Sequence, residues 1–205
     1  FNITFNGVKD SETSKNITWL SNVFAENKNA VIQYALKSQY NLLGEAAFSE
    51  VTGRSVLYAF TGSQNVLENY AVNINSVIIN GLESGKEYVY RVGNGVYWSE
   101  IKEFKTGYKY SDVNFVILGD IQTRNYDVFR NNISRISING IDYDFVIQVG
   151  DFVDDANTYS NWDGILSAVT ESFMGNLDII HVLGNHEFYG DESGDIATDI
   201  FNLPD

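Results

Sequence analysis

"VNFVILGD" at residues 113–120 decides the fold of the second half of this 205-residue chain. A continuous apolar run ends there in Gly-Asp. The pattern returns as "YDFVIQVGD" at 143–151 and, ending in Gly-Asn, as "LDIIHVLGN" at 177–185. Short runs that are apolar throughout and end at a glycine are typical of strands buried on both faces of a parallel sheet.

The two segments between these runs, 126–137 and 160–173, have the spacing of amphipathic helices. Their apolar residues on one helical face are Val128, Phe129, Ile133 and Ile136 in the first, and Trp162, Ile165, Leu166, Val169 and Phe173 in the second. Ser160 and Asp163 are spaced as a capping box. The order predicts an α/β domain with a parallel β-α-β-α-β core and right-handed crossovers.

The first half has a different period. Six short β-rich runs follow one another without a helical stripe, at 17–23, 30–36, 55–60, 72–79, 88–92 and 100–106. This pattern predicts an all-β antiparallel sandwich. We therefore expect two domains, 1–107 and 108–205, joined through "KTGYKYSD" at 105–112.

One stretch in the first half, "GLESGKEYVYRV" at 81–92, sharpens this expectation. Leu82 stands six residues before Tyr88, which resembles the tyrosine corner of fibronectin type III domains, although Ser84 stands where proline is common in that family. In "ITWL", Trp19 is similar to the second strand of such domains. We expect Trp19 and Tyr88 to be core residues rather than ligand-binding residues.

The formal net charge of −14 lies almost entirely in the second half. Residues 108–205 carry 4 Lys+Arg and 17 Asp+Glu, against 9 and 10 in residues 1–107. This balance argues against a nucleic-acid partner. No apolar run is long enough to span a membrane, and the start "FNITFNGVKD" has no signal-peptide pattern. With no cysteine, disulfides and thiolate metal sites are excluded.

The three predicted strands of the second half end in Gly followed by Asp120, Asp151 or Asn185. In an open α/β sheet the ligand site lies at the carboxyl ends of the strands, so these side chains should converge. Two carboxylates and an amide oxygen suit hard or borderline divalent cations. A carboxylate can also bridge two such ions.

The motifs "GDIQ", "GDFVDD" and "GNHE" resemble the first three motifs of the calcineurin-like metallophosphoesterases. With the fibronectin-like half in front and "FNLP" at 201–204, the chain resembles purple acid phosphatases of bacterial type. The resemblance implies a metal-dependent phosphoesterase that acts on a phosphate ester, most simply a phosphomonoester, through a metal-activated hydroxide. It also implies an extracellular or cell-surface location.

By the same resemblance, Asp120 would bind a first metal, Asp151 would bridge both metals and Asn185 would bind the second. His186 would reach the substrate phosphate or protonate the leaving oxygen, and Glu187 would orient His186 or the turn. The cofactor would be two divalent or mixed-valence ions of iron, zinc or manganese, whose identity the sequence leaves open.

Three departures from the family pattern stand out. Gln122 occupies a position where purple acid phosphatases have glycine and other members have a metal-binding histidine. Asp154 replaces the tyrosine that gives the purple enzymes their colour, so we expect no purple absorption band. The family's further histidine ligands are absent from these 205 residues, and His181, inside an apolar run, is expected to be structural.

From these departures we expect weak metal binding and little turnover by this chain alone. An uncovered apolar sheet face would need the missing C-terminal half of the catalytic domain, or would lead to self-association. The alternative reading is a non-catalytic extracellular binding or surface module with a degenerate phosphoesterase domain. Gln122 and Asp154 favour that alternative, whereas the joint presence of Asp120, Asp151 and Asn-His-Glu argues against it.

Overall fold

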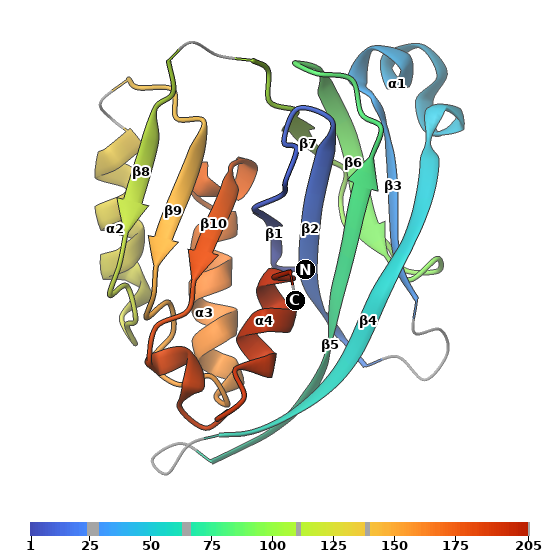
Figure 1. The fold of residues 1–205 in the computed structure, drawn as a ribbon. Coiled ribbons are helices and arrows are strands. Elements are labelled where there is room, and N and C mark those ends of the chain that lie inside the picture. The colour runs from blue at the N-terminus through green and yellow to red at the C-terminus, as the bar shows by residue number, and fades with distance from the viewer. Residues whose placement is uncertain (24–28, 63–66, 110–111, 138–139, 205) are drawn as a thin grey trace.

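The computed structural model of the chain describes residues 1–23, 29–62, 67–109, 112–137 and 140–204. Within them, one continuous sheet has the strand order β7-β6-β3-β4-β5-β2-β1-β10-β9-β8 (Figure 1). Two positions of the expected linker, 110 and 111, lie outside the described residues. In the described part of the chain, no helix is long and apolar enough to cross a membrane.

The strands are β1 (Ile3–Asn6), β2 (Ser14–Asn22), β3 (Ala30–Leu36), β4 (Ser49–Gly62), β5 (Leu67–Asn80), β6 (Glu87–Gly93), β7 (Lys102–Lys105), β8 (Phe115–Leu118), β9 (Phe145–Val149) and β10 (Asp178–Val182). The α-helices are α1 (Lys37–Leu43), α2 (Tyr126–Ser137), α3 (Tyr159–Thr170) and α4 (Asp195–Phe201). Three short 3-10 helices are η1 (Gly44–Ala47), η2 (Phe173–Asn176) and η3 (His186–Phe188).

The strands of the first half pair antiparallel and enclose one core. Side chains of β1, β2 and β5 meet those of β3, β6 and β7 in that core, which includes Trp19 and Tyr88 as expected. The Tyr88 hydroxyl accepts the backbone N–H of Glu83 at 2.8 Å, and Leu82 is buried in the same core. This bond fixes the turn that leads into β6.

The prediction that the first half contains only β-structure was wrong. Helix α1 and the following turn η1 are formed by "KSQYNLLGEAA", and α1 buries none of its side chains. Leu42 and Leu43 are exposed. Because a sequence period reports a buried face, a helix without one leaves no apolar stripe to detect.

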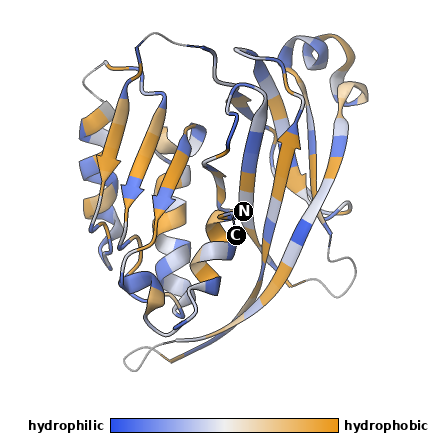
Figure 2. Ribbon diagram, in the orientation of Figure 1, coloured by the Kyte–Doolittle hydropathy of each residue, from blue (hydrophilic) through white to orange (hydrophobic). Residues whose placement is uncertain are grey.

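In the second half, β8 pairs with β9 and β9 with β10, both in parallel. Helices α2 and α3 lie against one face of these strands (Figure 1), and the ribbon of Figure 2 is coloured as hydrophobic along most of β8, β9 and β10. Strand β1 also pairs in parallel with β10, with Phe5 opposite Asp178, so both halves share one sheet. The sequence offered no signal for this pairing, since it joins segments more than 170 residues apart.

The two helices follow the predicted faces with three differences. Phe173, predicted on the face of the second helix, lies beyond the end of α3, in η2. In α2, Phe129 and Ile133 are buried but Val128 is exposed. The capping box was wrong, because Ser160 lies inside α3 and the N-cap, Thr158, makes no side-chain capping bond. Instead, the Glu68 carboxylate of β5 accepts the backbone N–H groups of Tyr159 at 2.6 Å and Ser160 at 3.2 Å. A residue distant in sequence therefore satisfies the helix N-terminus.

Candidate functional site

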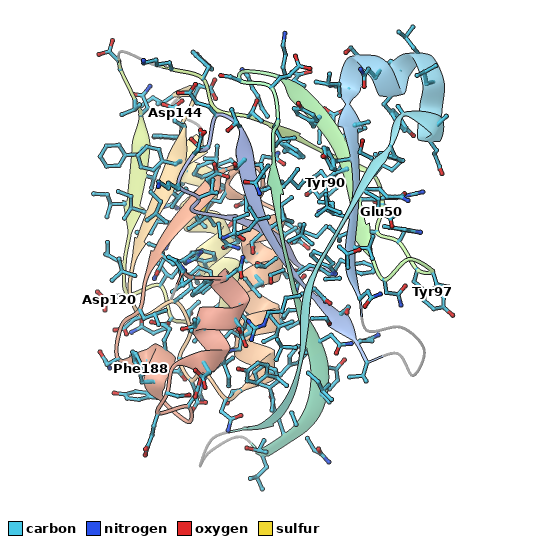
Figure 3. All side chains as sticks on the ribbon, turned by 45° about the vertical axis from the view of Figure 1, so that its right-hand side comes forward. Glu50, Tyr90, Tyr97, Asp120, Asp144 and Phe188 are labelled. Carbon is cyan, nitrogen blue, oxygen red and sulfur yellow. The ribbon has the colours of Figure 1, made fainter. Side chains whose placement is uncertain are left out.

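Three loops follow the carboxyl ends of β8, β9 and β10 and carry Asp120, Asp151 and Asn185. Asp120 and Asp151 adopt left-handed backbone conformations, with φ of 49° and 55°. Aspartate is one of the few non-glycine residues that tolerates this region. Figure 3 shows Asp120 at the same end of the molecule as Phe188, opposite to Asp144. The backbone thus turns sharply at Asp120 and Asp151, the residues that follow Gly119 and Gly150.

Backbone hydrogen bonds hold the three loops together around Asp151. The N–H of Asp120 donates to the Gly150 carbonyl at 3.3 Å, and the N–H of Gln122 donates to the Asp151 carbonyl at 3.0 Å. From the third loop, the N–H of His186 donates to Asp151 Oδ1 at 3.0 Å. The structure therefore brings the sequence-predicted site residues to one end of the sheet.

Glycine at position 184 lets the second and third loops approach each other closely. A Cβ added to Gly184 would lie 2.3 Å from Asp151 Oδ1 and 2.5 Å from the Asp151 nitrogen. Real Cβ atoms do not show such contacts, so any larger residue would push the Asp151 loop away. The glycine of Gly-Asn-His-Glu thus makes room for the carboxylate of Gly-Asp.

Glu187 is fully buried and joins the same two loops with its carboxylate. Oε2 accepts the N–H groups of Asp151 at 2.9 Å and Gly184 at 2.7 Å. Oε1 accepts those of Phe152 at 2.7 Å and Val153 at 3.2 Å. The prediction that Glu187 orients the turn agrees with these bonds. Four charge-assisted bonds to one buried carboxylate form a strong local clamp.

His186 is fixed through one ring nitrogen. Its Nδ1 lies 2.8 Å from the carbonyl oxygen of Asp154, and since a carbonyl only accepts, Nδ1 must carry the proton. Its Nε2 is then the nitrogen that is left to meet another group. The Tyr189 ring lies 4.5 Å from the imidazole between centroids. The backbone of Asp154 thus sets the orientation of His186.

The side chain of Asp154 binds Arg124, a contact that the sequence analysis missed. Arg124 Nε and Nη2 lie 2.9 Å and 2.6 Å from Asp154 Oδ2. The only sequence signal was that Arg124 is one of four cations in residues 108–205.

Two amide side chains contribute oxygens. Asn185 donates its Nδ2 to the Tyr189 hydroxyl at 3.0 Å, which leaves its Oδ1 as an acceptor or ligand. Gln122 Oε1 is buried and has no hydrogen-bond partner within the described residues. A buried oxygen without a partner is costly unless another group binds it. In kind, these donors fit a hard cation.

In number, the donors are few. Within residues 1–23, 29–62, 67–109, 112–137 and 140–204, no group of three or more His, Cys, Asp or Glu side chains is arranged to hold a metal ion. Asp120, Asp151 and Asn185, with Gln122, supply at most four oxygen-bearing groups. Two metal ions need more ligands than these.

His181 lies apart from this site, as predicted. It is buried in β10, its ring stacked on Phe201 at 3.5 Å between centroids and edge-on to Phe152 at 5.5 Å. Neither ring nitrogen has a hydrogen-bond partner within the described part of the chain. Burial lowers the pKa of His181 from 6.5 to about 3, so the ring is neutral.

With this geometry established, comparison with known families gives two matches. Residues 1–106 match the family model "Purple acid Phosphatase, N-terminal domain", which covers more than half of the chain. The chain belongs to the purple acid phosphatase family. Residues 113–203 match the model "Calcineurin-like phosphoesterase". The resemblance expected from the motifs is therefore confirmed.

Solved structures share its fold. A purple acid phosphatase, PPD1, from seeds of yellow lupin (Lupinus luteus) matches with a TM-score of 0.74 and 20% identity, over 100% of this chain and 41% of the lupin chain. PhoD matches with a TM-score of 0.55 and 13% identity, over 92% of this chain and 39% of that one. No curated protein sequence matches the chain. The chain thus spans about two fifths of the length of these relatives.

Proposed function

We propose that this chain contributes part of the active site of a metal-dependent phosphoesterase that hydrolyses phosphomonoesters. The observation that carries the proposal is the convergence of three strand-end loops around Asp151. The backbone N–H groups of Gln122 and His186 bind Asp151 itself, and that of Asp120 binds the preceding residue, Gly150. This is the place where open α/β sheets bind ligands. The family membership supports the same chemistry.

In this proposal, Asp120 and Asp151 would hold metal ions through their carboxylates, with Asp151 shared between the two ions, and Asn185 would bind through its amide oxygen. The ions, when bound, supply Lewis-acid chemistry that activates water and neutralises charge on the phosphoryl group. Iron, zinc and manganese are the candidates. Asp154, in place of tyrosine, predicts a site without the purple band.

His186 is the proposed catalytic residue. Because Nδ1–H donates to the Asp154 carbonyl, Nε2 is the atom that, once it is protonated as well, would donate to a phosphate oxygen or give its proton to the leaving oxygen. Glu187 holds the turn that carries His186 and Asn185. It acts on the reaction only through these two neighbours.

The remaining metal ligands would come from outside these 205 residues. An apolar surface on β8–β10, on the face not covered by helices, supports this proposal. Its exposed side chains are Phe115, Ile117, Val149, Ile180 and Val182. An exposed apolar face of a sheet is characteristic of a surface that packs against another part of the protein or against a partner. We propose that the cover is the C-terminal half of the catalytic domain, with self-association as the substitute when that half is absent.

For the first half, we propose a fibronectin type III-like sandwich over residues 1–107, followed by a catalytic domain that starts at 108. The bond from Glu83 N–H to the Tyr88 hydroxyl and the buried Leu82 support the resemblance. An extracellular or cell-surface location is part of the same proposal. The alternative, a non-catalytic surface module, is less well supported because the clamp by Glu187 keeps Asp151 and Asn185 in position.

Two assays on this chain and on Asp151→Asn test the proposal. We expect less than one tightly bound metal per chain after desalting, measured by plasma mass spectrometry, and little hydrolysis of para-nitrophenyl phosphate with added manganese. A content of nearly two metals per chain, together with turnover that Asp151→Asn abolishes, would support the proposed phosphoesterase activity. The same result would contradict the proposal that the site lacks ligands. Turnover that is unchanged in Asp151→Asn would contradict the assignment of the site.

A further inference from the structure

Asp154 connects two side chains at the site, and the second has no assigned role. Its carbonyl oxygen binds His186 Nδ1, and its carboxylate oxygen Oδ2 binds both Nε and Nη2 of Arg124. Asp154 Oδ1 lies a further 3.9 Å from His186 Nδ1. One residue thus contacts both a guanidinium and an imidazole.

The charge of the second half makes this guanidinium unusual. Among the four cations of residues 108–205, Lys109 lies in the segment between the halves, and Arg130 and Arg135 lie on α2. Arg130 is already paired with Asp127 and Glu171. Arg124 is therefore the cation of this half that follows a strand of the site. A dianionic phosphate ester approaching so many carboxylates needs such a positive group.

The geometry of Arg124 leaves it able to bind a ligand. Its side chain is 61% exposed, and its two contacts with Asp154 use Nε and Nη2 only. A guanidinium has five N–H donors in a planar fork that matches phosphate oxygens. The bond to Asp154 limits the rotamers of a long side chain. This lowers the entropy that binding would cost.

We propose that Arg124 is a substrate-binding residue, whose guanidinium holds anionic oxygens of the phosphate group beside His186. Asp154 is the positioning residue for both. The inference rests on the proposed function, since it names a further phosphate contact at the same site. It also gives a role to Asp154, which stands where the purple enzymes have tyrosine.

The test is a titration of the chain with inorganic phosphate in magnesium-containing buffer, followed by the 15N resonance of the Arg124 Nε–Hε group. We expect a saturable shift. Arg124→Gln should weaken phosphate binding, measured on nearby backbone amides, about tenfold, because a charge-assisted hydrogen bond is lost. The phosphate affinity of Arg124→Lys should lie between those of the wild type and Arg124→Gln, since lysine keeps the positive charge but lacks the planar fork of N–H donors. Arg130→Gln is the matched control and should bind like the wild type.

Two results would overturn the inference: no saturable shift in the wild-type chain, or equal phosphate affinity in the wild type and Arg124→Gln. Circular dichroism of Arg124→Gln checks that this exposed substitution leaves the fold intact. A failure of the proposed function is distinguishable. Turnover that is unchanged in Asp151→Asn would reject the proposed site without altering the phosphate titration, whereas a phosphate affinity that Arg124→Gln does not lower would reject only the inference.

Discussion

The carboxylate of Glu187 accepts the backbone N–H of Asp151 at 2.9 Å and three further backbone N–H groups from two loops. These bonds hold together the second and third motifs of the site. Glu187→Gln replaces one carboxylate oxygen by an NH2 group. This group cannot accept the backbone N–H groups that the oxygen accepts now. We expect the free energy of unfolding, measured in urea, to fall by about 3 kcal/mol.

The control for this variant is Glu171→Gln, an exposed glutamate beside Arg130. It should change stability by less than about 0.5 kcal/mol. If Glu187→Gln were as stable as Glu171→Gln, the clamp would not contribute to the fold.

The close approach of Gly184 to Asp151 gives a second prediction. Gly184→Ala places a methyl group where Asp151 Oδ1 and its nitrogen now lie, so the two loops must separate. We expect the free energy of unfolding, measured by thermal denaturation, to fall by about 2 kcal/mol. We also expect shifts in the amide resonances of Asp151 and His186. Gly7→Ala, whose added carbon would make only an ordinary contact with Ile180, should leave both unchanged.

His181 predicts acid sensitivity. Its pKa is about 3 in the folded chain and 6.5 in the unfolded chain, so the unfolded state binds the extra proton between these values. The contribution of this group to stability is therefore fully kept above pH 6.5 and falls by about 5 kcal/mol as the pH drops toward 3. His181→Leu keeps an apolar contact with Phe201 and should show a shallower loss in urea unfolding across that range. Equal pH slopes for the two proteins would exclude His181 as the source.

The contact between the halves includes a buried ion pair. Lys15 Nζ lies 2.7 Å from Asp178 Oδ1, and the side chains are 4% and 12% exposed. Burial raises the pKa of Asp178, and the neighbouring Lys15 opposes that rise. Asp178→Asn leaves a buried ammonium without its partner and should cost about 3 kcal/mol.

The double variant Lys15→Met with Asp178→Asn tests whether the unpaired charge is the cause. It should recover part of the lost stability in calorimetry, since the buried ammonium is gone. A double variant less stable than Asp178→Asn would show that Lys15 stabilises the fold through other contacts, such as the Phe5 ring 5.5 Å away.

Much of the site could be predicted because local chemistry determines it. A strand that ends in Gly-Asp or Gly-Asn needs a sharp turn, so Asp120, Asp151 and Asn185 were recognisable from sequence and lie on neighbouring loops. The contact between Arg124 and Asp154 was not predictable, because it depends on how two loops 30 residues apart are placed.

Most elements of the fold could also be predicted from the sequence, but some could not. Periodicity identified strands β2 to β10 and most of the buried faces of α2 and α3, since both reflect burial. It missed the four-residue strand β1, which was not among the predicted runs. It failed for α1, which buries nothing, and for the capping of α3 by Glu68, which depends on tertiary structure. The parallel pairing of β1 with β10 left no local trace either.

We propose that Asp120, Asp151 and Asn185 together bind divalent cations. A manganese titration of this chain and of Asp151→Asn, followed by paramagnetic broadening of backbone amides, tests it most directly. We predict that broadening starts at residues 119–122, 150–152 and 184–186, and that Asp151→Asn needs about tenfold more manganese for the same effect. Broadening spread evenly over the acidic surface, and unaffected by Asp151→Asn, would contradict the account.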